Sequence, residues 1–217
     1  MTPHDHEDDP GPEEGYELLI GPAPFNAHPG IVSLLQENLL LNRQRKRAVK
    51  FSLTDPLTRL SNRGVGIHTL RQEISRSNRT AAPMAVLMLD LDRFKLLNDE
   101  YGHVVGDQAL RTAGEVLRRG IRRMDTAVRY GGEEFLVILP GTGLDEAAVI
   151  ATRVQVAVAA AGDALGLPLS VSIGLAGFIH GEDTVESILS RADRALYASK
   201  GRGRNRFSID GEGAMPT

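Results

Sequence analysis

Four carboxylates stand at positions of this sequence where an acidic side chain is unexpected. Asp90 lies at the end of the apolar run Met84–Leu91, and Asp92 follows it two residues later. Glu133 and Glu134 come directly after two adjacent glycines and precede the apolar stretch "FLVIL". An ionised carboxylate at the end of a buried strand costs free energy unless a cation, a hydrogen-bond donor or a metal ion meets it. These acids are therefore candidates for chemistry.

If the strand that begins at Glu133 lies beside the strand that ends near Asp90, the two carboxylates share one sheet edge and repel each other. Mg²⁺ relieves such repulsion, because it accepts carboxylate oxygens together with phosphate oxygens. In two-metal phosphoryl-transfer sites, one ion lowers the pKa of an attacking hydroxyl and the other holds a triphosphate. Gly131 and Gly132 would let the backbone approach such a ligand and adopt positive φ. Two plainer alternatives stay open: Asp90 caps the next helix, or "GGEE" is a solvated surface hairpin.

The apolar pattern predicts a sheet covered by helices. Strands are expected in "MAVLMLDL", in "TAVRY" and "EFLVIL" joined across Gly131–Gly132, in "LSVSIGLAGF" and in "RNRFSID". Helices are expected from Ser61 or Asn62 to Asn78, from Val105 to Gly120, and in "LDEAAVIATRVQVAVAAAG" and "VESILSRADRALYASK"; "RFKLLNDEYG" indicates a short helix or turn. Because strands and helices intermix, the predicted fold class is α/β (α+β), with a mixed, mainly antiparallel sheet.

The N-terminal part has a different composition. Residues 1–30 contain seven acids and many Pro and Gly, while all 25 Lys and Arg residues lie later; this predicts an acidic flexible tail. Residues 31–53 carry apolar and polar residues in steps of three and four (Val32, Leu35, Leu39, Asn42, Lys46 and Val49). This spacing is typical of a dimerising coiled-coil helix, and an ordinary amphipathic helix is the alternative.

Composition excludes some functions. The 217 residues contain no Cys, so disulfides, thiolate metal sites and a Cys nucleophile are excluded. No apolar run long enough for a membrane span is expected, and the acidic start is unlike a targeting segment. The prediction is a cytoplasmic protein that binds neither a membrane nor a nucleic-acid polymer.

Several ordered motifs together resemble one known family. "RYGGEEF" is similar to the signature of the GGDEF domain, in its GGEEF form. "DPLTRLSNR", "LDLDRFKLLNDEYGHVVGD", "SVSIGLA" and "ADRALYASKGRGRNR" are similar to other segments of this family, in the same order. The resemblance covers about Leu53 to Ile209 and implies a domain at 54–210 with the palm-like fold of nucleotidyl cyclases, followed by a disordered end at 211–217.

The resemblance implies a diguanylate cyclase. Such enzymes condense two GTP into cyclic di-GMP and release two pyrophosphates, with two Mg²⁺ or Mn²⁺ per active half-site. Each domain holds one GTP, so a homodimer through the N-terminal helix is implied, and the tail could dock a regulatory protein. The rival hypothesis is a non-catalytic receptor that binds GTP or cyclic di-GMP and signals through protein contacts.

The resemblance also assigns residues. Asp90 and Glu133 are implied metal ligands, with the Leu91 carbonyl assisting, and Glu134 is implied to support the metals or deprotonate the 3′-hydroxyl. Substrate contacts are implied for the guanine-reading Asn98 and Asp107, for the phosphate-binding Lys95, Lys200 and Arg204, for Phe94 as a packing residue, and for Gly131 and Gly132.

A second site is implied by "RRMD". Arg122 and Asp125 match the family's inhibitory R-x-x-D motif, which binds product away from the active site, and Arg153 is expected to add a contact. An ordinary surface salt bridge is the alternative. The chain departs from the family pattern at Arg59, where a Gly is usual, at Gly64, where an Arg is usual, and at Gln155, where many members carry Arg.

Overall fold

The computed structural model describes residues 34–40, 42 and 53–211, and the chain divides into two compact units, Met1–Val49 and Lys50–Thr217. In the first unit, residues 34–40 and 42 are helical. Leu35 and Leu39 of the expected seam are 60% and 42% exposed. The expected tail at 1–30, the remaining seam positions except Asn42, and residues 212–217 lie outside the described residues.

The second unit is built on a six-stranded sheet with the order β1-β3-β4-β2-β5-β6. The strands are β1 (Ser61–Asn62), β2 (Met84–Leu91), β3 (Thr126–Arg129), β4 (Glu134–Pro140), β5 (Val171–Gly177) and β6 (Phe207–Ile209). The β3-β4, β4-β2 and β2-β5 pairs are antiparallel, and the two outer pairs are parallel. The predicted mixed, mainly antiparallel sheet is therefore confirmed.

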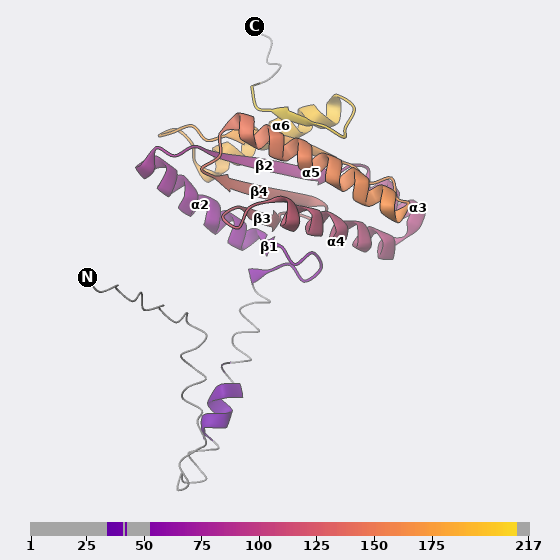
Figure 1. Ribbon diagram of the computed structural model, residues 1–217, viewed down its shortest axis with the longest axis horizontal. Coiled ribbons are helices and arrows are strands. Elements are labelled where there is room, and N and C mark those ends of the chain that lie inside the picture. Colours follow the sequence, from indigo (N-terminus) through magenta and orange to yellow (C-terminus); the bar gives the residue numbers. More distant parts are fainter. Residues whose placement is uncertain (1–33, 41, 43–52, 212–217) are drawn as a thin grey trace, which may run out of the picture. The chain divides into compact units, whose positions relative to one another are not determined.

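Helices cover both faces of this sheet (Figure 1). They are α2 (Arg63–Thr80), α3 (Phe94–Tyr101), α4 (His103–Gly120), α5 (Leu144–Leu165) and α6 (Val185–Gly201). One core packs α3, α4 and α5 against the sheet, and the other packs α2 and α6. Along β2, Leu87 and Leu89 belong to the first core and Val86 and Met88 to the second. Period two therefore places Asp90 on the face covered by α6.

The helix predictions agree with the structure apart from their ends, and "RFKLLNDEYG" forms the helix α3. The side chain of Asn62 caps α2 as expected, since its Oδ1 accepts a hydrogen bond from the Val65 N–H at 3.0 Å. The two-residue strand β1 was not predicted. Its shortness explains this, because two residues carry no periodic pattern.

The expectation that no apolar run reaches the length of a membrane span was wrong for α5. This helix has 22 residues and an 18-residue window with a mean hydropathy of 1.4, which is enough by length and composition. Ala147, Ile150, Ala151 and Val154 of α5 are buried in the first core, so the apolar side of the helix packs against the sheet.

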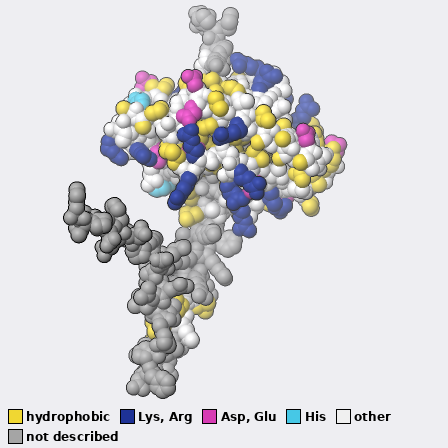
Figure 2. Space-filling view, viewed as in Figure 1, with side chains coloured by type: hydrophobic (Ala, Val, Ile, Leu, Met, Phe, Trp, Pro, Cys, Tyr) yellow, Lys and Arg dark blue, Asp and Glu magenta, His cyan; other side chains and the backbone are white. Residues whose placement is uncertain are grey.

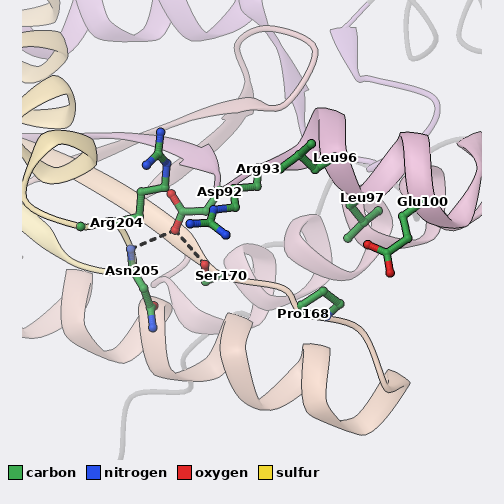
Figure 3. A pocket seen from close by; sticks show the side chains of 10 residues that line it. Asp92, Arg93, Leu96, Leu97, Glu100, Pro168, Ser170, Arg204 and Asn205 are labelled. Carbon is green, nitrogen blue, oxygen red and sulfur yellow. Dashed lines mark hydrogen bonds between the residues drawn. The ribbon is translucent and has the colours of Figure 1, made fainter.

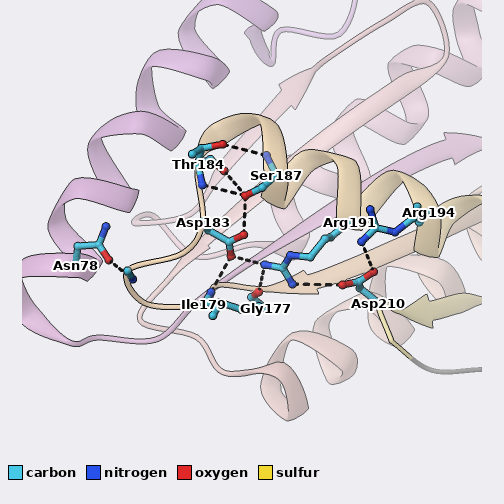
Figure 4. A network of polar contacts seen from close by, with 10 residues as sticks. Asn78, Gly177, Ile179, Asp183, Thr184, Ser187, Arg191, Arg194 and Asp210 are labelled. Atoms are coloured by element: carbon cyan, nitrogen blue, oxygen red, sulfur yellow. Dashed lines mark hydrogen bonds and ion pairs between the residues drawn. The ribbon is translucent and has the colours of Figure 1, made fainter. Parts of the chain in front are cut away.

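A polar network fixes α6 on its face of the sheet (Figure 4). The buried Asp183 accepts hydrogen bonds from Arg191 and from the Ile179 N–H, and Arg191 also bonds the Gly177 carbonyl at 2.6 Å and Asp210 at 3.4 Å. The guanidinium thus joins β5, the start of α6 and the segment after β6. Because the last turn of α6 carries Lys200, this network sets where that lysine lies.

Candidate active site

The carboxylates meet where β2 ends and β4 begins. In the antiparallel register Asp90 is the partner of Glu134, and the Leu91 N–H donates to the Glu133 carbonyl at 3.3 Å. Asp90 and Glu133 therefore lie at one sheet edge, as the sequence predicted. Asp90 does not cap the next helix, because Arg93 holds the N-cap position of α3 and no side chain bonds there. That alternative was wrong.

The carboxylates at this sheet edge repel one another. Burial raises the pKa of Glu133, and the charges of Asp90 and Glu134 raise it further, while Lys200 partly offsets them. Asp90 is only 6% exposed, and its Oδ2 lies 2.8 Å from Lys200 Nζ. Lys200 thus compensates Asp90, whereas Glu133 forms no ion pair with any described residue. The edge carries more negative charge than the protein neutralises.

The residues fit a divalent cation that is coordinated partly by protein carboxylates and partly by the phosphates of a nucleotide. Within residues 34–40, 42 and 53–211, no group of three or more His, Asp or Glu side chains could hold a metal ion unaided. Mg²⁺ is commonly bound through one or two carboxylates plus substrate phosphates, so a complete protein cage is not required. The unrelieved repulsion between Asp90 and Glu133 is what such a cation would remove.

The glycines form a loop rather than the two-residue turn that was expected. Residues 130–133 lie between β3 and β4, and the Tyr130 and Gly131 N–H groups both donate to the Glu134 carbonyl, at 2.8 and 3.1 Å. Neither Gly131 nor Gly132 has positive φ, so that expectation was wrong. A Cβ at Gly131 would lie 2.3 Å from Glu134 Oε2, the mobile end of that side chain, so a larger residue there would shift the Glu134 carboxylate.

Arg129, which no sequence pattern indicated as a site residue, holds this loop. Its Nη2 and Nε donate to the Gly132 carbonyl at 2.8 and 3.2 Å, and its Nη1 lies 3.1 Å from Asp55 Oδ2. Asp55 also accepts from the N–H and the hydroxyl of Thr58, both at 2.8 Å. The loop before Glu133 is thus tied to the linker segment, defined as residues 53–60. The sequence around Arg129 does not predict this ion pair, because Asp55 is 74 residues away.

The guanine-reading candidates lie on two adjoining helices. Asn98 and Phe94 of α3 pack against Gly106 of α4, where a Cβ would lie 1.8 Å from Asn98 Oδ1 and 3.3 Å from the Phe94 ring. Phe94 is buried, as expected of a packing residue. Asp107 follows Gly106, is exposed, and lies 3.7 Å from Arg111. The missing side chain at Gly106 therefore lets Asn98 lie close to the first turn of α4.

The phosphate candidates come from separate segments. Lys95 is exposed in the first turn of α3, and Arg204 is exposed in the loop after α6, where its φ of 63° is left-handed. This loop is held by Asp92, whose carboxylate accepts from the Asn205 N–H at 2.9 Å and from the hydroxyl of Ser170 (Figure 3). The same carboxylate also accepts from the hydroxyl of Ser172 at 2.6 Å. Asp92 is thus satisfied by protein donors and positions the Arg204 loop.

The R-x-x-D residues lie in the turn between α4 and β3. The Arg122 N–H donates to Asp125 Oδ2 at 2.8 Å, and the Arg122 side chain pairs with Glu146. Arg153 bonds the Gly120 carbonyl and is close enough to Asp125 to lower its pKa. Burial nevertheless leaves the pKa of Asp125 raised, and its Oδ1 is buried with no hydrogen-bond partner among the described residues. The three predicted residues therefore lie together.

The chain is similar to known proteins in sequence and in fold. Residues 52–206 match the family model described as "Diguanylate cyclase, GGDEF domain". The chain is 40% identical over 172 residues to diguanylate cyclase DgcP of Pseudomonas aeruginosa, covering 78% of the chain and 25% of DgcP. The chain spans 25% of the length of DgcP and 38% of that of diguanylate cyclase A of Treponema denticola.

Two solved structures are similar over most of the chain. The coiled coil and GGDEF domain of DgcB from Caulobacter crescentus, in complex with c-di-GMP, has 29% identity and a TM-score of 0.76, with 82% of this chain and 96% of the chain in that structure covered. Diguanylate cyclase SiaD of Pseudomonas aeruginosa, in complex with its activator SiaC, has 32% identity and a TM-score of 0.70, with 83% and 70% covered.

Proposed function

Because this chain belongs to the GGDEF-domain family of diguanylate cyclases, we propose that it condenses two GTP molecules into cyclic di-GMP with release of two pyrophosphates. The observation that carries the proposal is the pair of carboxylates, Asp90 and Glu133, at one sheet edge beside the glycine loop, where Lys200 pairs only with Asp90. The catalytic domain is proposed to span residues 54–210.

Asp90 and Glu133, with the Leu91 carbonyl, are proposed to hold two Mg²⁺ or Mn²⁺ ions per half-site. When bound, the ions supply charge neutralisation and activation of the 3′-hydroxyl. Glu134 lies beside Glu133 and is proposed to support these ligands or to accept the proton of that hydroxyl. Gly131 contributes by leaving room for the Glu134 carboxylate.

Asn98 and Asp107 are proposed to read guanine from adjoining helices. A carboxylate accepts from the N1–H and N2–H₂ edge of guanine, which adenine lacks. Lys95, Lys200 and Arg204 are proposed to bind the triphosphate. Lys200 Nζ lies 2.8 Å from Asp90 Oδ2, which places its ammonium beside the proposed metal ligands.

The active species is proposed to be a homodimer joined through residues 31–53, since each domain holds one GTP and the product needs two. Leu35 and Leu39 are apolar side chains that are 60% and 42% exposed, which supports a partner helix. A regulatory protein is proposed to act on residues 1–30, by analogy with the activator bound to SiaD. The chain is proposed to be cytoplasmic, with no membrane or nucleic-acid polymer as partner.

Product inhibition is proposed to act through Arg122, Asp125 and Arg153. Asp125 Oδ1 is a buried acceptor that lacks a donor, and the N–H groups of a guanine base would provide one. Arg122 and Arg153 would contact the phosphates or the O6 and N7 atoms of the base.

The test of the proposed function is product analysis. Purified protein is incubated with GTP and Mg²⁺, and nucleotides are identified by chromatography and mass spectrometry, with Glu133→Ala in parallel. Cyclic di-GMP from the wild type alone is expected. Comparable product from Glu133→Ala would refute the metal-ligand role. No product even after the N-terminal helix is replaced by a strong coiled coil would favour the receptor alternative.

A further inference from the structure

Arg59 adopts a backbone conformation that its residue type disfavours. Its φ is 63°, in the left-handed region, where a Cβ is sterically unfavourable and Gly is the usual residue. The side chain is exposed, so burial of apolar surface does not compensate for this cost. A non-glycine residue at such a position is worth a functional explanation.

The fold places Arg59 beside the R-x-x-D turn. Strand β1 runs parallel to β3, with Ser61 paired to Val128, so the residues just before each strand lie at the same end of the sheet. Arg59 precedes β1, and Asp125 precedes β3. Both line one cavity of about 280 Å³, which also contains Arg118, Arg122 and Arg123. Basic side chains gather over the region of α4 and β1 (Figure 2).

The charges in this cavity are unbalanced. Its lining contains four guanidinium groups and one carboxylate, that of Asp125. Arg118 is paired with Glu115, and Arg122 is paired with Glu146. The Arg59 guanidinium forms no hydrogen bond or ion pair with any residue that the structure describes. An unpaired cation therefore shares the cavity with the partnerless acceptor atom, Asp125 Oδ1, whose residue is only 8% exposed.

We propose that Arg59 is a ligand-binding residue of the R-x-x-D site, where it contacts a phosphate of cyclic di-GMP while Asp125 accepts from a guanine base. This proposal rests on the proposed product site and extends it to the linker segment. A phosphate is the complementary group, because guanidinium and phosphate form short, charge-assisted bonds. One molecule bound in this way would connect the linker segment to the turn between α4 and β3. Product binding would therefore restrain the segment that follows the N-terminal helix in the chain.

Calorimetric titration of cyclic di-GMP into the full-length protein, freed of bound nucleotide, tests the proposal. Arg59→Gln removes the charge and keeps a Cβ, while Arg59→Gly also removes the backbone strain. Both are expected to bind roughly 3-fold to 10-fold more weakly, as for loss of one partly exposed charged contact. Only Arg59→Gly should gain thermal stability. Arg79→Gln, which removes an exposed charge at the end of α2, is the matched control and should bind as the wild type does.

Hydrogen exchange adds a local measurement. Ligand binding should protect the backbone amides of residues 55–60 in the wild type, and this protection should be lost in Arg59→Gln while protection at Arg122–Asp125 persists. If the wild type binds, Arg122→Ala does not, and Arg59→Gln binds with wild-type affinity and protection, the role of Arg59 is overturned. If the wild type does not bind cyclic di-GMP, the product site itself is rejected, and Arg59 with it. Product analysis with Glu133→Ala is independent of both results.

Discussion

Replacing Arg129 by Met should weaken both the fold and the active-site loop. The Arg129 and Asp55 side chains are 18% and 17% exposed, so the pair is mostly shielded from water. Breaking a fully buried ion pair costs about 3–5 kcal/mol. Asp55 keeps its two bonds from Thr58 and some contact with water, so the cost should be smaller here. The free energy of unfolding should fall by about 1–3 kcal/mol. For a domain of this size, each kcal/mol lowers Tm by roughly 2–4 °C.

The matched variant is Asp55→Asn, which removes the charge and keeps the shape. Urea denaturation of the two single variants and the double variant should give a coupling energy of about 0.5–3 kcal/mol, because the side chains are in direct contact. Burial alone would raise the pKa of Asp55, but the bonds from Thr58 and the charge of Arg129 outweigh it and hold the pKa below its ordinary value. A lowered pKa means that Asp55 stabilises the fold above its unfolded-state pKa, and that this contribution is lost as pH falls through the folded-state value.

Catalysis should respond because Arg129 also holds the Gly132 carbonyl next to Glu133. A loosened loop misplaces the carboxylate, and the turnover rate of Arg129→Met should drop roughly 10-fold or more. Product formation from GTP, measured at a temperature where the variant is folded, provides this value. Equal denaturation midpoints and equal rates for the wild type and Arg129→Met would refute the reasoning, and additive effects of the two single variants would refute the coupling.

Three further changes test other parts of the site. Lys200→Met should tighten Mg²⁺ binding measured by calorimetry without nucleotide, because Lys200 occupies Asp90; weaker or unchanged binding would contradict this competition. Gly106→Ala should raise the KM for GTP about 10-fold or more, because the new Cβ displaces Asn98 in a site that depends on close positioning. An unchanged KM together with an unchanged Tm would exclude Asn98 from substrate binding. Burial is the main cause of the raised pKa of Asp125, so inhibition by cyclic di-GMP should weaken as pH falls through that raised value. The same shift means that Asp125 favours folding at acid pH and that this gain is lost as pH rises, which Asp125→Asn should abolish in pH-dependent denaturation.

The parts of the site that the sequence predicted are those set by local pattern. The sequence predicted β2, β3 and β4 and placed Asp90 and Glu133 at strand ends, and the pairing of β2 with β4, on which the prediction was conditional, brings Asp90 beside Glu134. Asn98 was assigned by resemblance, and its contact with Gly106 depends on helix packing that has no local signature. The positive φ expected of the two glycines was wrong; at Gly131 the lack of a side chain leaves room for the Glu134 carboxylate, whereas the structure gives no such reason for Gly132.

The interactions that the sequence did not predict connect distant segments. Lys200 meets Asp90 because α6 covers the face to which period two directs Asp90, a consequence of topology rather than of either motif. Arg129 contacts Asp55 across 74 residues, and Asp92 contacts Asn205 across 113. Side chains of this kind are identified in sequence only as solvated charges, because nothing near them in the chain reveals the partner.

The same linker segment lies near both ends of one short strand. β3 is four residues long, with Asp125 just before it and Arg129 at its end. Asp55 of the linker bonds Arg129, which holds the loop before Glu133, and Arg59 of the linker lines the cavity of Asp125. A movement of residues 55–59 would therefore act on the catalytic loop through an ion pair and on the proposed product site through a ligand. Since this segment follows the N-terminal helix in the chain, activation through that helix and inhibition by product would converge on the same few residues.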